Sequence, residues 1–137
     1  MLRPVEVEVE LARGLSAASE ARSAVRELLG DGASDAFVSD AVLATSELVT
    51  NALVHSDGVL ALSAYFDRER GWLRVEVSDS TRSLPRIPDR APNQVGGLGL
   101  GVVAQVSSAW GSFPIERGKT VWFELLHSPV AAGDGQP

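Results

Sequence analysis

A long helical pattern constrains the fold most. It begins after Ser34 and continues to about His55. Apolar residues recur along it at helical spacing, namely Val38, Ala41, Val42, Leu48, Val49 and Ala52. A helix with one apolar side must bury that side against a second layer of structure. The rest of the chain therefore has to supply that layer.

The flanking segments predict strands and a second helix. Residues 5–10 alternate valine with glutamate, which is typical of a half-buried strand with an acidic outer face. We expect a helix from Ala17 to Leu29, with Ser16 as its N-cap and Gly30 at its end. Four further strands are expected, at Val59–Phe66, Trp72–Asp79, Trp110–Ile115 and Thr120–Leu126.

The segment between the strands expected at 59–79 and those expected at 110–126 has a different composition. Residues 80–95 carry three prolines and no period, which predicts a loop. The glycine-rich run 96–101 follows and is expected to open a short helix reaching about Ala109. From Ser128 onward the composition predicts a flexible tail.

The order of these elements predicts an α+β fold. Short connections make neighbouring strands mostly antiparallel, so we expect a two-layer α/β sandwich with a mixed, mostly antiparallel sheet and helices on one face. The chain has 137 residues, which is enough for one domain. We assign that domain to residues 1–127 and the tail to residues 128–137.

Composition narrows the function. Twelve basic and eighteen acidic residues give a net charge of −6, which argues against a general binder of nucleic acid or of anionic membranes. The chain has no cysteine, and its start lacks the apolar core of a signal peptide. No stretch approaches the roughly 18 apolar residues that a membrane span needs, so we expect a cytoplasmic protein without a membrane partner.

One polar face of the long helix is a candidate site. Glu47, Asn51 and His55 are spaced by four residues and share a face. An amide oxygen can bind Mg²⁺, and a carboxylate one turn away can accept a proton from an attacking hydroxyl. The alternative is an ordinary solvated face of an amphipathic helix.

Two further signals lie nearer the C-terminus. Asp79 ends an apolar strand stripe, where it is either a buried acceptor for an amino group such as that of adenine or an exposed acid at a strand end. The glycines at 97, 99 and 101 let a backbone approach phosphates, or else form a flexible turn. Val102 and Phe113 stand where a dinucleotide fingerprint and a Walker A loop, respectively, require glycine.

These signals occur in an informative order. Glu47 with Asn51, then Asp79, then Gly97-Leu98-Gly99-Leu100-Gly101 resembles the N, G1 and G2 boxes of the GHKL ATPases. The run Glu47-Leu48-Val49-Thr50-Asn51-Ala52 is most similar to the small anti-sigma factor serine kinases of that superfamily. The resemblance implies a Bergerat fold that binds ATP and Mg²⁺. It extends over roughly residues 17–126.

The resemblance also implies roles for single residues. Asn51 would hold Mg²⁺, Glu47 would act as the base and Asp79 would accept from the adenine amino group. Gly97, Gly99, Leu100 and Gly101 would bind the phosphates, with the loop over residues 80–95 as part of a lid. Thr120 would lie near the adenine. Lys119, the only lysine, is a candidate neighbour of the pocket.

Kinases of this family transfer the γ-phosphate to a serine of a STAS-type antagonist protein, and also bind a sigma factor. The resemblance thus implies those two partners and a homodimer, without direct contact to nucleic acid. The G1 box usually reads D-x-G-x-G, whereas residues 79–83 contain no glycine. This departure leaves open a module that binds a partner without turning over ATP. A structural domain with coincidental motifs is the third possibility.

Overall fold

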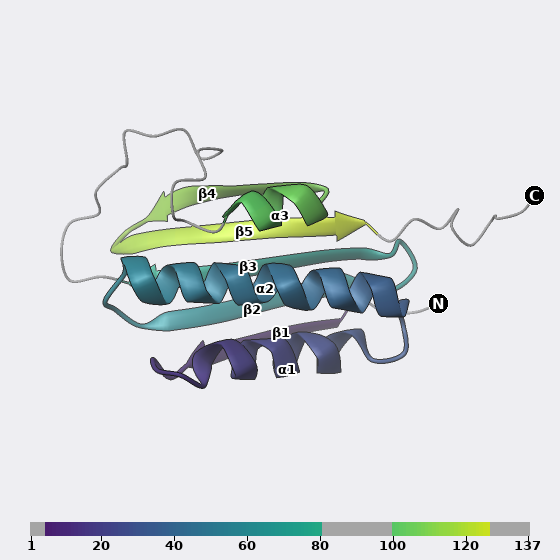
Figure 1. The fold of residues 1–137 in the computed structure, drawn as a ribbon, viewed down its shortest axis with the longest axis horizontal. Coiled ribbons are helices and arrows are strands. Elements are labelled where there is room, and N and C mark those ends of the chain that lie inside the picture. Colours follow the sequence, from purple (N-terminus) through teal and green to yellow (C-terminus); the bar gives the residue numbers. More distant parts are fainter. Residues whose placement is uncertain (1–4, 81–99, 127–137) are drawn as a thin grey trace, which may run out of the picture.

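The computed structural model describes residues 5–80 and 100–126, apart from the side chain of Leu100 (Figure 1). The elements in chain order are β1 (Val5–Leu11), α1 (Ala17–Leu29), α2 (Asp35–His55), β2 (Leu60–Asp67), β3 (Trp72–Ser80), α3 (Leu100–Val106), β4 (Ala109–Ile115) and β5 (Gly118–Leu126). The predicted loop beyond residue 80, Gly97, Gly99 and the predicted tail at 128–137 lie outside the described residues.

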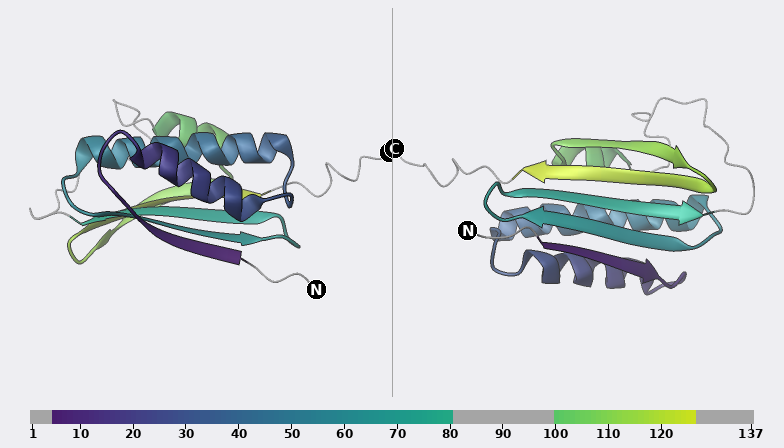
Figure 2. Two further views of the ribbon diagram at one scale, coloured as in Figure 1. Left: turned by 90° about the horizontal axis from the view of Figure 1, so that it is seen from below. Right: turned by 180° about the vertical axis from the view of Figure 1, so that it is seen from behind.

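Five strands form one sheet in the order β1-β2-β3-β5-β4. All four pairings are antiparallel, so the described strands include none of the parallel pairs that a mixed sheet would have. The three helices lie on one face of this sheet, and no other described element covers the opposite face (Figure 2). The predicted two-layer α+β sandwich is thereby confirmed.

The core lies between the two layers. Alternate residues of the central strands are buried toward the helices, namely Leu60, Leu62, Ala64, Phe66, Leu73, Val75 and Val77. Helix α1 adds Ala17, Ala21, Val25 and Leu29, and α2 adds eight buried residues between Phe37 and Ala52. Burying one large apolar side chain stabilises a fold by about 1.5–3 kcal/mol, so this interface supplies most of the driving force.

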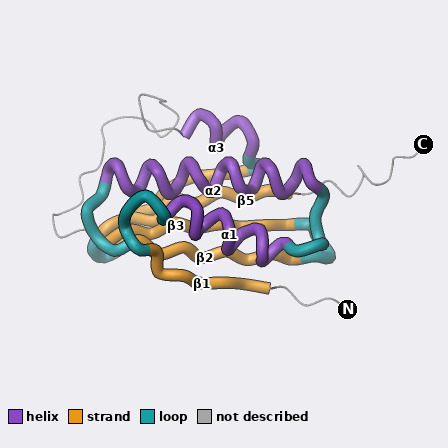
Figure 3. The backbone as a smooth tube through the Cα atoms, turned by 60° about the horizontal axis from the view of Figure 1, so that its bottom comes forward, coloured by secondary structure: helices purple, strands orange, loops and turns teal. Residues whose placement is uncertain are grey.

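Helix α2 is long and apolar enough to pass a length-and-composition test for a membrane span, with a mean hydropathy of 1.3. This test tolerates polar residues, and Asp40, Glu47 and Asn51 interrupt the apolar residues of α2. In this fold α2 is a core helix, because it packs on β3 and β5 and is flanked by α1 and α3 (Figure 3).

Two helix ends differ from the predictions. Ser34 caps α2 by accepting a hydrogen bond from the Phe37 N–H at 3.1 Å. Ser16 does not cap α1, because its backbone is already helical and its hydroxyl donates to Glu20 instead. Helix α3 ends at Val106 and not near Ala109, since the Ser108 N–H donates to the Glu124 carbonyl and starts the pairing of β4 with β5.

Arg13 ties the β1–α1 connection to the C-terminal end of α2. Its guanidinium donates to the carbonyls of Leu53, Ser56 and Gly58, at 3.1, 2.6 and 2.8 Å. The last carbonyls of a helix have no partner within it, and a cation is favoured there by the helix dipole. This contact fixes the turn that carries the chain from α2 into β2.

Replacing Arg13 with lysine should destabilise the fold by roughly 1–2 kcal/mol, because a compact ammonium keeps the charge but lacks the wide planar fork by which two guanidinium nitrogens reach separate carbonyls. Urea unfolding followed by circular dichroism measures this difference. Arg70→Lys is the matched control, since Arg70 is exposed and its ion pair with Asp67 is 3.9 Å long. Equal stabilities of the two variants would contradict the assigned role of Arg13.

Candidate functional site

The predicted polar face of α2 lies on the side of the helix away from α1. Val42 and Ser46 line a groove with Arg22 of α1. Asn51 follows Val42 by nine residues, which places it about 180° around the helix at 100° per residue. Glu47 is half-buried on the same side, while His55 is exposed at the helix end. This side of α2 is the one that packs toward α3.

Asn51 is the most informative residue of that face. Its side chain is 7% exposed, and its Oδ1 atom has no hydrogen-bond partner in the described part of the chain. A buried carbonyl oxygen without a partner costs on the order of 1–3 kcal/mol. The interpretation of this face as merely solvated is therefore wrong for Asn51, and its oxygen is free to accept from a ligand or to bind a cation.

Asp79 ends the buried row of β3 and faces the helices. It is 4% exposed, so the alternative of an exposed acid at a strand end is wrong. Burial raises the pKa of its carboxyl above the ordinary value. Lys119 and Arg13 oppose that increase in pKa, and Asp57 adds to it. Burial thus disfavours the ionised form of this carboxyl, which a hydrogen-bond donor of a ligand would stabilise.

The pairing of β3 with β5 places Lys119 and Thr120, which are adjacent in sequence, on opposite faces of the sheet. Asp79 pairs with Lys119, and Ser78 pairs with Thr120. Directly paired residues share a face of the sheet, so Lys119 lies on the helix side with Asp79 while Thr120 lies on the other side. There the Thr120 hydroxyl is 2.7 Å from that of Ser78. The structure brings Asp79 together with Lys119, and does not bring it together with Thr120.

Gly118 holds this register in place. Its φ is +149°, and a Cβ atom at this position would overlap the main-chain carbonyl of Asp79. Only glycine permits such a close approach. The sequence patterns did not predict the packing of Gly118 against Asp79. No local pattern indicates this contact, because it depends on the pairing of β3 with β5.

The predicted phosphate-binding run is only partly described. Gly97 and Gly99 lie outside the described residues. Leu100 begins α3 and Gly101 lies in its first turn, so a helix does follow the glycine run. Their roles stay predictions.

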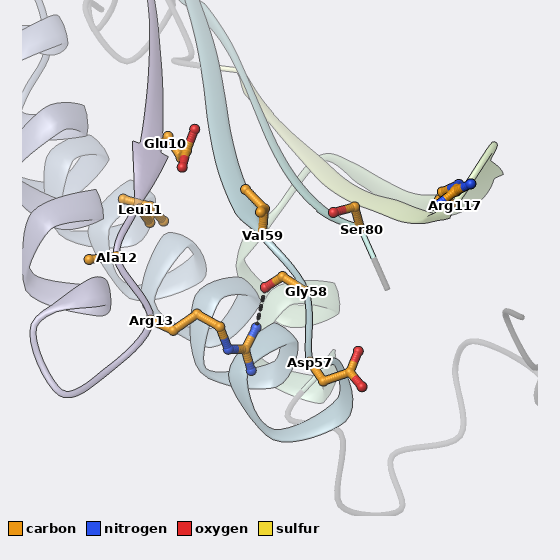
Figure 4. Close-up of a pocket in the computed structure, with 9 residues that line it drawn as sticks. All are labelled: Glu10, Leu11, Ala12, Arg13, Asp57, Gly58, Val59, Ser80 and Arg117. Carbon is orange, nitrogen blue, oxygen red and sulfur yellow. Dashed lines mark hydrogen bonds between the residues drawn. The ribbon is translucent and has the colours of Figure 1, made fainter. Parts of the chain in front are cut away.

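A pocket of about 440 Å³ opens at the end of the sheet (Figure 4). Its lining residues come from the end of β1, the turn between α2 and β2, Ser80 and Arg117. It contains none of Glu47, Asn51 and Asp79, although Ser80 adjoins the last of these. The pocket is therefore a separate feature from the predicted site.

No group of three or more His, Asp or Glu residues in the described ranges is arranged to hold a metal ion by itself. Mg²⁺ in nucleotide sites usually needs only one or two protein oxygens, because phosphates and waters complete its shell. The buried, unpartnered Oδ1 of Asn51 fits that requirement.

Comparison with known proteins identifies the family of the chain. The histidine kinase-like ATPase domain family matches residues 11–124 of the chain. The chain therefore belongs to the histidine kinase-like ATPase domain family, and the predicted relationship to the GHKL ATPases is confirmed. Membership of an ATPase family supports the binding of ATP.

A solved structure has the same fold. It contains the RsbU and RsbW domains of Rv1364c from Mycobacterium tuberculosis, with a TM-score of 0.68 and 24% sequence identity. The similarity covers 91% of this chain and 33% of that one, so the chain spans about a third of the length of its structural relative. No curated protein matches.

Replacing Gly118 with alanine should destabilise the fold strongly. Gly14→Ala is the matched control, because Gly14 has a similar φ of +140° but open space around it. The control should lose about 1–3 kcal/mol from backbone strain. Gly118→Ala should lose about 2 kcal/mol more, because its methyl group displaces Asp79. Urea unfolding measures both; equal losses would contradict the packing of Gly118 on Asp79.

Asp79→Asn should stabilise the nucleotide-free protein at pH 7. A carboxyl whose pKa is raised by folding contributes its full stability below its ordinary pKa of 3.8 and loses it as the pH rises through the folded value. The variant should therefore melt above the parent at pH 7, and the difference should shrink toward pH 3.5. Asp40→Asn, an exposed change on α2, is the control in thermal melts. A lower melting temperature of Asp79→Asn at pH 7 would contradict the argument.

Proposed function

We propose that this chain is an ATP-dependent protein serine kinase of the anti-sigma factor type. The observation that carries the proposal is the buried, unpartnered oxygen of Asn51, one helical turn from Glu47. An unsatisfied oxygen in a core helix is a liability unless a ligand uses it. Together with the family and the buried Asp79, it supports a site for a magnesium nucleotide.

Each residue has a proposed task. Asp79 accepts a hydrogen bond from the 6-amino group of adenine, Asn51 holds Mg²⁺, and Glu47 accepts the proton of the attacking serine hydroxyl. Bound Mg²⁺ supplies neutralisation of phosphate charge. Phosphoryl transfer otherwise depends mainly on positioning, so a few oriented groups suffice. Gly97, Gly99, Leu100 and Gly101 are proposed to contact the phosphates.

The partners are proposed on the same basis. We infer a STAS-type antagonist as the phosphate acceptor and a sigma factor as the second partner, which fits the RsbW domain named in the related structure. We also propose a cytoplasmic homodimer. We propose that residues 1–127 form one domain.

A second candidate function is a partner-binding module that holds ATP without transferring its phosphate. The observation that favours it is Ser80, which directly follows Asp79 and is half-buried in β3. The usual G1 box has glycines after its aspartate, and this chain continues the strand where that turn would begin. The experiment below separates the two functions.

Asn51→Ala should weaken binding of ATP in the presence of Mg²⁺ at least tenfold, because it removes the proposed protein ligand of the cation. Calorimetric titration with and without Mg²⁺ measures this. Thr45→Val is the matched control, since Thr45 Oγ1 is the other buried, unpartnered oxygen of α2. Glu47→Gln should bind ATP normally but lower transfer of labelled γ-phosphate to STAS antagonists by roughly 10²–10⁴-fold.

Three results would revise the proposal. If Asn51→Ala binds magnesium ATP as tightly as the parent, Asn51 is not its ligand. If the parent binds ATP but phosphorylates no antagonist, the partner-binding module is the function. If Glu47→Gln transfers phosphate at the parental rate, another group is the base.

A further inference from the structure

A row of three residues crosses one end of the three central strands on the helix side. Asp79 of β3 pairs with Leu60 of β2 on one side and with Lys119 of β5 on the other. Lys119 is the only lysine among 137 residues. The only lysine ammonium group of the sequence therefore lies at a half-buried position next to a buried carboxylate.

Other donors near Asp79 are already engaged or point elsewhere. The hydroxyl of Thr120 is on the opposite face, bonded to Ser78. The guanidinium of Arg13 is committed to the carbonyls at the end of α2. Lys119 forms no hydrogen bond or ion pair with another described residue, so its donors remain available.

Electrostatics agrees with this placement. Of the charged groups that act on Asp79, Lys119 is the strongest one to favour the ionised carboxylate, ahead of Arg13, while Asp57 opposes it. The neighbouring Leu60 is fully buried and supplies an apolar flank. The row therefore offers an acceptor, a donor and an apolar surface side by side.

We propose that Lys119 is a base-specificity residue that donates a hydrogen bond to the N1 atom of adenine while Asp79 accepts from the 6-amino group. The inference rests on the proposed function, because it concerns the same nucleotide. The adenine edge carries its amino donor directly beside the N1 acceptor. Asp79 and Lys119 are directly paired on adjacent strands, whose backbones are about 4.8 Å apart, so an acceptor and a donor lie side by side as those two atoms do.

Calorimetric titration with ADP and with 1-deaza-ADP, which has C–H in place of N1, tests the contact. The parent should bind ADP about tenfold more tightly than 1-deaza-ADP, as expected for a charged hydrogen bond. Lys119→Met should bind ADP about tenfold more weakly than the parent, and its preference for ADP should fall below twofold. Lys119→Arg, which keeps a charged donor, should retain part of the preference.

Arg117→Gln is the matched control, because it removes one positive charge from the same hairpin at an exposed position. It should keep the preference for ADP. A preference that persists in Lys119→Met would overturn the inference, as would equal weakening of both nucleotides, which indicates a contact with phosphate.

The parent alone provides a test that does not depend on folding of the variants. If it binds ADP and 1-deaza-ADP equally, this inference fails while the proposed ATP binding stands. If it binds no adenine nucleotide, the proposed function fails and the inference fails with it.

Discussion

The structure depends on the burial of α2 against the sheet. This helix lies between α1 and α3 and directly over β3 and β5, so three of its sides are enclosed. Ala41, Ala44 and Ala52 bring its backbone close to the strands. A helix in such a position excludes water along most of its length. Any polar side chain that it carries there is therefore either satisfied by a partner or held ready for one.

The burial of α2 explains why the candidate site contains polar groups that do not stabilise the nucleotide-free protein. The oxygen of Asn51 and the carboxylate of Asp79 are both buried by the same layers, one from the helix and one from the strand. Neither group helps the fold in the nucleotide-free protein, since the oxygen of Asn51 lacks a partner among the described residues and burial raises the pKa of the Asp79 carboxyl. Groups held at such a disadvantage are typical of binding sites, because a ligand recovers the energy.

Much of the architecture could be predicted because it is encoded locally. The alternation in β1, the stripe of α2 and the cap at Ser34 each depend on neighbouring residues. Sequence patterns are least informative where distant segments decide. The expected end of the third helix was wrong because Ser108 meets Glu124 and leaves the helical path. Strand pairing likewise decides that Lys119, and not Thr120, shares a face with Asp79. Pairing between strands 40 residues apart leaves no periodic signal in either strand.

The register of β5 consequently determines the chemistry beside Asp79. Gly118 packs so closely on the Asp79 carbonyl that β5 cannot slide along β3 without a collision or a gap. A shift by one residue would exchange every side chain of β5 between the two faces. The residue directly after Gly118 is thus the one presented to Asp79, and here it is a lysine and not the threonine one position later. The order of two adjacent residues decides whether the buried carboxylate has an ammonium or a hydroxyl as its neighbour.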